Sequence, residues 1–151
     1  MKEAITLLRN IRANYVRELN QLTLDELNYI PPTHNNNIIW NIGHSLVVQQ
    51  LLCYKFSNLD TYLTDPILAK YARGTAPTAN VPKIEVDLIR KMLIKSVDLL
   101  EKDMAAQRFQ VYKEYTVGFG AHLTSITEAI TFNNVHESLH YGYLMALKKL
   151  L

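Results

Sequence analysis

The sequence predicts an all-α protein folded as a four-helix bundle, and three observations support this prediction. Four stretches of roughly twenty residues carry apolar side chains at three- and four-residue spacing, as amphipathic helices do. Capping residues and prolines mark the ends of these stretches. Two long irregular connections separate them, which indicates that at least one connection runs the length of the bundle. The chain of 151 residues can bury one core without disulfides, so we expect residues 1–151 to form a single domain.

The first predicted helix runs from near the N-terminus to about Leu22 and is followed by a short turn. Thr23 and Glu26 have the spacing of a capping box, in which each side chain accepts a hydrogen bond from the other residue's backbone N–H. Pro31 and Pro32 then end the turn, because the second proline disfavours helical angles at the first. The apolar face of this first helix consists of Ile5, Leu8, Ile11, Tyr15, Leu19 and Leu22.

The second predicted helix begins near Asn36 or Asn37, either of which can cap it, and ends around residues 56–58. In the connection that follows, Asp65-Pro66 has the pattern of an N-cap and a first-turn proline. Gly74 can close the short helix that begins there. The apolar face of the second helix consists of Trp40, His44, Val47, Val48 and Leu51.

The third predicted helix begins at Pro82, and the last one runs from Ser125 to the end of the sequence. Ser125 and Glu128 again have the spacing of a capping box. Between these two helices, residues 108–123 mix β-branched and aromatic side chains with two glycines, which predicts an extended or hairpin-like crossing. The apolar face of the third helix consists of Val86, Ile89, Leu93, Val97, Leu100 and Met104.

Two histidines of the last helix lie one turn apart on its apolar face. His136 and His140 are separated by about 40° around the helix and by ~6 Å along its axis, so both can bind one ion. His44 lies on the apolar face of the second helix, whereas Cys53 falls on the opposite side and is a poor ligand. A lone histidine in such a place is more often a hydrogen-bonded core residue. Three together favour a metal ion held by His44, His136 and His140.

The residues from His136 to His140 also match HExxH, the zinc-peptidase pattern in which the glutamate acts as general base. Two observations disfavour a peptidase. Residues 141–151 contain no histidine or acidic residue to complete the ligand set, and no clear strand pattern precedes the helix to form a substrate-binding sheet. We therefore interpret Glu137 as a solvated helix residue, although its place between two candidate ligands keeps it a candidate for the pocket around the ion.

Several side chains near the histidines are candidates for that pocket or for hydrogen bonds to the ligands. Asn37 and Asn41 lie on or near the His44 face, where they could orient a substrate, but capping explains Asn37 equally well. Trp40 and Tyr143 are expected to fill the core more readily than to line a pocket. The two remaining histidines, His34 and His122, lie in connections and are expected to be exposed, with His122 able to line the pocket mouth.

Composition excludes several classes of protein. Sixteen basic and fourteen acidic side chains give a net charge of +2 that is spread along the chain, which argues against a nucleic-acid surface. The single cysteine, Cys53, cannot form an internal disulfide and fits a reducing compartment. The N-terminal segment lacks the continuous apolar stretch of a signal peptide or membrane span, so we expect a cytoplasmic protein without membrane partners.

Three motifs together resemble the DinB-like superfamily, and the resemblance covers nearly the whole chain. They are NNIIWNIGH at Asn36–His44, RGTAP at Arg73–Pro77 and HESLHYG at His136–Gly142. The resemblance implies a bundle in up-down-down-up order, often a homodimer. It also implies one divalent metal ion, zinc or nickel or another, held by His44, His136 and His140. Members of known activity resemble thiol-dependent transferases or hydrolases.

The sequence thus predicts a metal-dependent enzyme acting on a small molecule. Three neutral imidazoles leave a coordination position open, where a water could be acidified or a low-molecular-weight thiol deprotonated. Hydrolysis and transfer of a small electrophile onto a thiol both fit. The alternative is a non-catalytic metal-binding or stress-response protein, which the lack of an evident general base favours. An open pocket beside the ion would favour the enzyme, and a site closed by apolar residues would favour the alternative.

Overall fold

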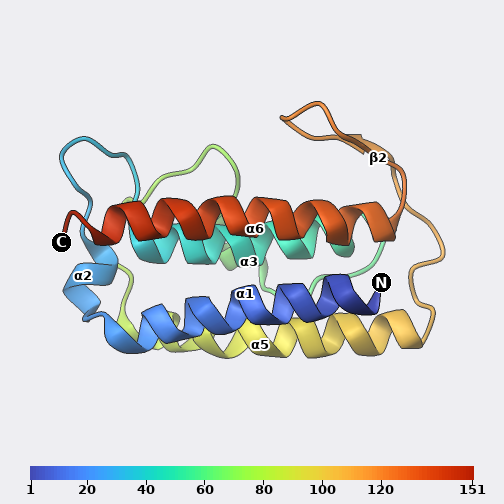
Figure 1. The fold of residues 1–151 in the computed structure, drawn as a ribbon, viewed down its shortest axis with the longest axis horizontal. Helices are drawn as coiled ribbons and strands as arrows, with labels where there is room; N and C mark the ends of the chain where they lie inside the picture. Colours follow the sequence, from blue (N-terminus) through green and yellow to red (C-terminus); the bar gives the residue numbers. More distant parts are fainter.

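The computed structural model describes residues 1–151 and confirms the predicted four-helix bundle. The four long helices are α1 (Lys2–Gln21), α3 (Ile38–Cys53), α5 (Lys83–Ala105) and α6 (Ile126–Lys148). They lie side by side, with α1 and α6 running in one direction and α3 and α5 in the other (Figure 1). This is the up-down-down-up order that the family resemblance implies. Both α1 and α3 pack against α5 and α6.

The shorter elements lie in the connections between the long helices. They are α2 (Leu24–Asn28), the 3-10 helix η1 (Lys55–Ser57), α4 (Asp65–Lys70), β1 (Tyr115–Thr116) and β2 (His122–Leu123). Because α3 and α5 are parallel, the segment joining them runs back along the bundle. The segment between α5 and α6 instead folds into a hairpin at one end, where β1 and β2 pair antiparallel (Figure 1). Of the two predicted forms, extended or hairpin-like, this segment takes the hairpin.

Two predicted helix starts are confirmed by hydrogen bonds. Thr23 and Glu26 form a complete capping box at the start of α2. At the start of α3, the Trp40 backbone N–H donates to the Asn37 side chain, with a nitrogen to oxygen distance of 2.9 Å. Asn37 is therefore the N-cap, and its side chain does not reach the histidines because its amide group donates to the backbone oxygen of Asn28 instead.

Two other predicted caps differ in detail. Ser125 caps α6, but the Glu128 carboxylate accepts from the backbone N–H of Thr124 and not from that of Ser125, so the predicted capping box is incomplete. At α4 the N-cap is Thr64, and Asp65 is already the first helical residue. Both differences shift a cap by one residue, which side-chain spacing alone does not resolve.

Nearly every residue of α3 is buried, because this helix meets α5 and α6 in the bundle and α2 at its start. The main core joins all four long helices, and a second apolar cluster lies at the end where α1 begins. A polar residue carried on the inner faces of α3 or α6 is thus held in a rigid, largely dry setting. None of the helices has the length and apolar character needed to cross a membrane.

Candidate metal centre

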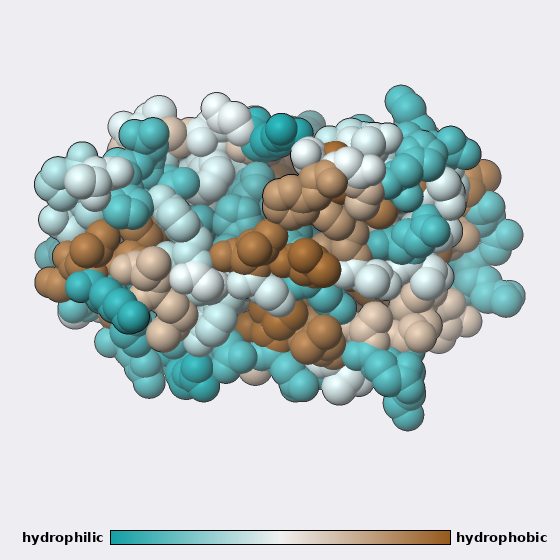
Figure 2. Space-filling model, turned by 45° about the horizontal axis from the view of Figure 1, so that its top comes forward, coloured by the Kyte–Doolittle hydropathy of each residue, from teal (hydrophilic) through white to brown (hydrophobic).

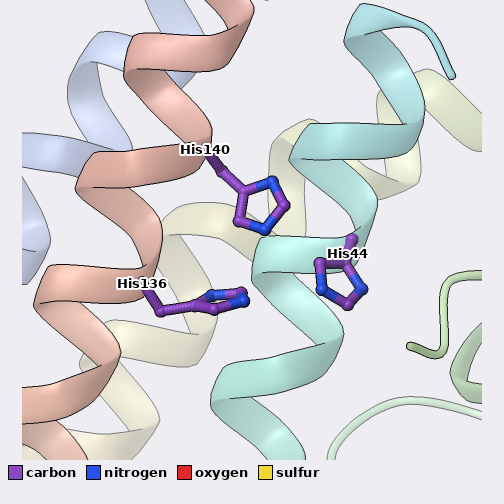
Figure 3. A group of neighbouring side chains, drawn as sticks. All are labelled: His44, His136 and His140. Carbon is purple, nitrogen blue, oxygen red and sulfur yellow. The ribbon is translucent and has the colours of Figure 1, made fainter. Parts of the chain in front are cut away.

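The structure brings His44 of α3 together with His136 and His140 of α6. His136 and His140 point from α6 towards α3, and the three imidazole rings lie next to one another (Figure 3). One nitrogen from each ring lies within 4.8 Å of the others. Two nitrogen ligands on a tetrahedral zinc ion lie about 3.4 Å apart. The three nitrogens would therefore have to move closer together to share one ion.

Two of the three imidazoles are oriented by hydrogen bonds from Nδ1. His44 Nδ1 lies 2.7 Å from the backbone oxygen of Tyr71, and His140 Nδ1 lies 2.8 Å from Oδ1 of Asn41. Both partners are acceptors, so both Nδ1 atoms carry the proton and both Nε2 atoms are left with a free lone pair. This arrangement is typical of metal-binding histidines, whose second nitrogen is commonly fixed by a carbonyl.

The third imidazole is incompletely satisfied within the protein. His136 Nδ1 is buried and has no hydrogen-bond partner. Burial, together with the neighbouring imidazoles, lowers the pKa of His136 to about 3 and that of His140 to about 4. Burial also lowers the pKa of His44. All three rings are consequently neutral near pH 7, which is the state that binds a metal, and the cluster could hold one metal ion.

Two further candidates contact the histidines directly. Trp40 is buried and stacks on His44, with ring centroids 4.8 Å apart and planes 8° from parallel. Its indole N–H donates to Oγ1 of Thr75, so Trp40 fills the core as expected and also fixes one face of the His44 ring. The Asn41 side-chain oxygen accepts a hydrogen bond from His140 Nδ1, which is the kind of contact that a residue supporting a metal ligand would make.

The interpretation of Tyr143 as a core residue is wrong. Its side chain is 38% exposed, and its ring lies against His34, with centroids 5.7 Å apart. His34 is half-buried by this contact and is not fully exposed as expected. Neither residue reaches the metal cluster. Cys53 is fully buried outside that cluster, where burial raises the pKa of its thiol to about 12, as befits a poor ligand.

The interpretation of Glu137 as a solvated residue is also wrong. Glu137 is fully buried, and Arg12 of α1 donates from Nε and Nη2 to its two carboxylate oxygens, each at 2.6 Å. Asn133 donates a third hydrogen bond to the same carboxylate at 2.7 Å. Glu137 points towards α1 and away from the imidazoles, so it cannot act as the general base of a peptidase.

The sequence analysis missed Arg12, although a signal for it was present. Arg12 lies between Leu8 and Tyr15 on the apolar face of α1, at four- and three-residue spacing. A charged residue on such a face must find a partner in the core. In the structure this partner is Glu137.

A pocket of about 390 Å³ opens beside His44 and His136. It is bordered by α3, α6, the β1–β2 hairpin and the loop after α4. His122 does not line it, because that side chain points to Thr116 and Glu114 on the exposed side of the hairpin. The lining residues are His44, Val48, Leu51, Leu52, Lys55, Phe56, Arg73, Tyr115, Val117, Gly118, Phe119, Phe132 and His136.

These observations define a class of protein: a four-helix bundle in up-down-down-up order whose three inward histidines could hold one metal ion beside an open pocket. The chain belongs to the DinB superfamily, whose sequence pattern matches residues 7–144. No curated protein matches the chain.

Proposed function

We propose that the protein is a divalent-metal-dependent enzyme that acts on a small molecule at His44, His136 and His140. The pocket carries this proposal, because its apolar space of about 390 Å³ ends at two of the three candidate ligands. A purely structural metal site is normally closed by protein ligands, whereas a catalytic one keeps a position open for substrate. Three neutral imidazoles suit zinc or nickel.

Transfer onto a low-molecular-weight thiol is the reaction that the lining residues support best. When bound, the metal ion supplies Lewis acidity that generates a nucleophile from a thiol or a water near neutral pH. No carboxylate lines the pocket, and Glu137 is held by Arg12, so the metal ion alone would have to activate the nucleophile. A thiol is easier to activate in this way than a water, because the pKa of a free thiol is about 8.5 and that of water is about 15.7. Its sulfur then bonds to the electrophilic carbon, and the leaving group departs with the bonding electron pair.

Metal content tests the site. We expect the purified protein to contain one zinc or nickel ion per chain, measured by elemental analysis, and His44→Ala and His136→Ala to lose it. His122→Ala is the matched control, because this exposed histidine lies outside the cluster, and it should retain the metal. Full metal content in both cluster variants would rule out the three-histidine site.

Turnover tests the enzyme. A screen of thiols against small electrophiles should reveal product formation by the metal-loaded protein that disappears when a chelator removes the ion. The alternative, a non-catalytic metal-binding or stress-response protein, predicts bound metal and no turnover with any pair. Hydrolysis without added thiol would instead favour a hydrolase that uses the same site.

A homodimer is part of the proposal. Figure 2 shows apolar surface gathered in the middle of the face that carries α6, with polar residues around it. On α6, Val135 is 50% exposed and Leu139 is 51% exposed, and their four-residue spacing puts them side by side on one face of the helix, as in a contiguous apolar patch. Sedimentation equilibrium should give a dimer for the wild type and a monomer for Leu139→Glu. A wild-type monomer at micromolar concentration would exclude this assembly.

A further inference from the structure

Two cationic side chains stand at the pocket and have no acidic partner. Lys55 and Arg73 are its charged lining residues, because His44 and His136 are neutral near pH 7. Both cations are exposed, and neither forms an ion pair. By contrast, Arg9, Arg12 and Arg108 each pair with a carboxylate. The pocket therefore carries a local positive charge that the protein itself does not neutralise.

The two cations come from different segments of the pocket border. Lys55 begins η1, directly after α3, and Arg73 lies in the loop after α4. The Arg73 guanidinium rests against the hairpin turn, since a Cβ added at Gly118 would lie 3.7 Å from its Nη2. Most of the remaining lining is apolar. Its aromatic members are Phe56, Tyr115, Phe119 and Phe132.

We propose that this pocket selects a small organic anion with an apolar body. The body lies against the aromatic side chains, the acid group pairs with Lys55 and Arg73, and the reacting end faces His44 and His136. This inference rests on the proposed function, since it names the substrate class of that same site. Unpaired cations beside low-dielectric walls attract anions and repel cations, and guanidinium groups bind carboxylates through two parallel hydrogen bonds.

A matched pair of ligands tests the selection. 4-Phenylbutanoate and 4-phenylbutanamide have nearly the same shape and differ in charge, and calorimetry can measure the binding of each. We expect the wild type to bind the anion about fivefold more tightly than the amide, as for a partly exposed ion pair. Lys55→Gln with Arg73→Gln should abolish this preference. Lys91→Gln with Lys95→Gln removes the same charge from exposed positions on α5 outside the pocket, and should retain the preference.

The measurement is made on both the metal-free and the zinc-loaded protein, because a carboxylate could bind the ion directly. A preference that appears only with zinc would overturn the proposal, as would an equal preference in the Lys55 and Arg73 double variant, or no binding of either ligand. The metal-free result does not depend on metal content or turnover, so failure of the enzyme proposal is seen separately. Either the thiol or its co-substrate can carry the acid group. In turnover assays, the double variant raises the KM of the substrate that carries it.

Discussion

His136 and Glu137 are neighbours on α6, yet they lie in opposite environments. The helix turns about 100° between them. His136 faces α3 and the pocket, and its Nδ1 is buried without a partner. Glu137 faces α1, where Arg12 and Asn133 satisfy its carboxylate. The Glu137 carboxylate is therefore satisfied within the chain, whereas His136 Nδ1 keeps a buried lone pair or N–H without a protein partner, as the proposed metal site requires.

The largest effect is expected on the Glu137 side. Glu137→Ala leaves the Arg12 guanidinium buried without a counter-charge, which costs about 3–5 kcal/mol of unfolding free energy. Urea unfolding of the metal-free protein measures this loss. Glu101→Ala is the control, because Glu101 pairs with Arg9 at the surface and its removal should cost less than about 1 kcal/mol.

A second variant separates the effect of the buried charges on stability from the effect of the volume that the two side chains fill. Arg12→Leu with Glu137→Leu removes both charges together, and we expect it to recover most of the lost stability. If Glu137→Ala cost no more than Glu101→Ala, this ion pair would have no structural role, and the contrast between the two faces of α6 would disappear.

The opposite pattern is expected for His136. His136→Ala should weaken zinc binding by more than about 100-fold, since it removes a direct ligand. The stability of the metal-free protein should change by no more than about 1 kcal/mol, because His136 Nδ1 makes no hydrogen bond that could be lost. Competition with a chelator measures the first effect and thermal unfolding the second. A large loss of metal-free stability would place His136 with Glu137 as a structural residue.

The fold was predictable because it depends on periodicity and caps, which are local. The faces of the four long helices, the capping box at Thr23 and the cap at Asn37 were all present in the sequence. Helical arithmetic also put His136 and His140 on one side of α6. Local spacing does not say which helix packs against that side of α6. His44 was added to the predicted metal ligands because it lies on an apolar face and because of the family resemblance.

The remaining features depend on contacts between distant segments. Periodicity indicates which residues share a face, but not which helix that face meets, so the Arg12 partner of Glu137 was missed. The pocket border likewise comes from two connections, which bring Arg73 and the hairpin together over α3 and α6. No spacing rule relates residues 73 and 118, because the path of each connection is set by packing.

A smaller effect is expected at the acceptor that orients His140. Asn41→Ala removes the oxygen that accepts the hydrogen bond from His140 Nδ1, and losses of this kind weaken metal binding by about 10- to 100-fold. Asn41→Asp keeps an acceptor in place and should retain most of the affinity. Zinc titration of both variants tests the assignment. Equal losses in the two would indicate that Asn41 acts instead through its amide group, which donates to the Asn36 side chain and to the backbone oxygen of Asn37.

The smallest effect on metal binding is expected at Gly43. A substitution there tests whether packing positions the backbone oxygen that accepts from His44. A Cβ added at Gly43 would lie 2.5 Å from the Tyr71 ring, and the backbone oxygen of Tyr71 accepts from His44 Nδ1. Tyr71 is fully buried and its hydroxyl donates to Glu85, so the ring cannot move without displacing that backbone. We expect Gly43→Ala to cost about 1–3 kcal/mol in stability and about tenfold in zinc affinity. Gly142→Ala on α6 meets no atom within 4 Å and should stabilise the helix by about 0.5–1 kcal/mol without changing zinc affinity. Equal zinc affinity in the two alanine variants would show that the His44 ring does not need the Tyr71 carbonyl in its present place.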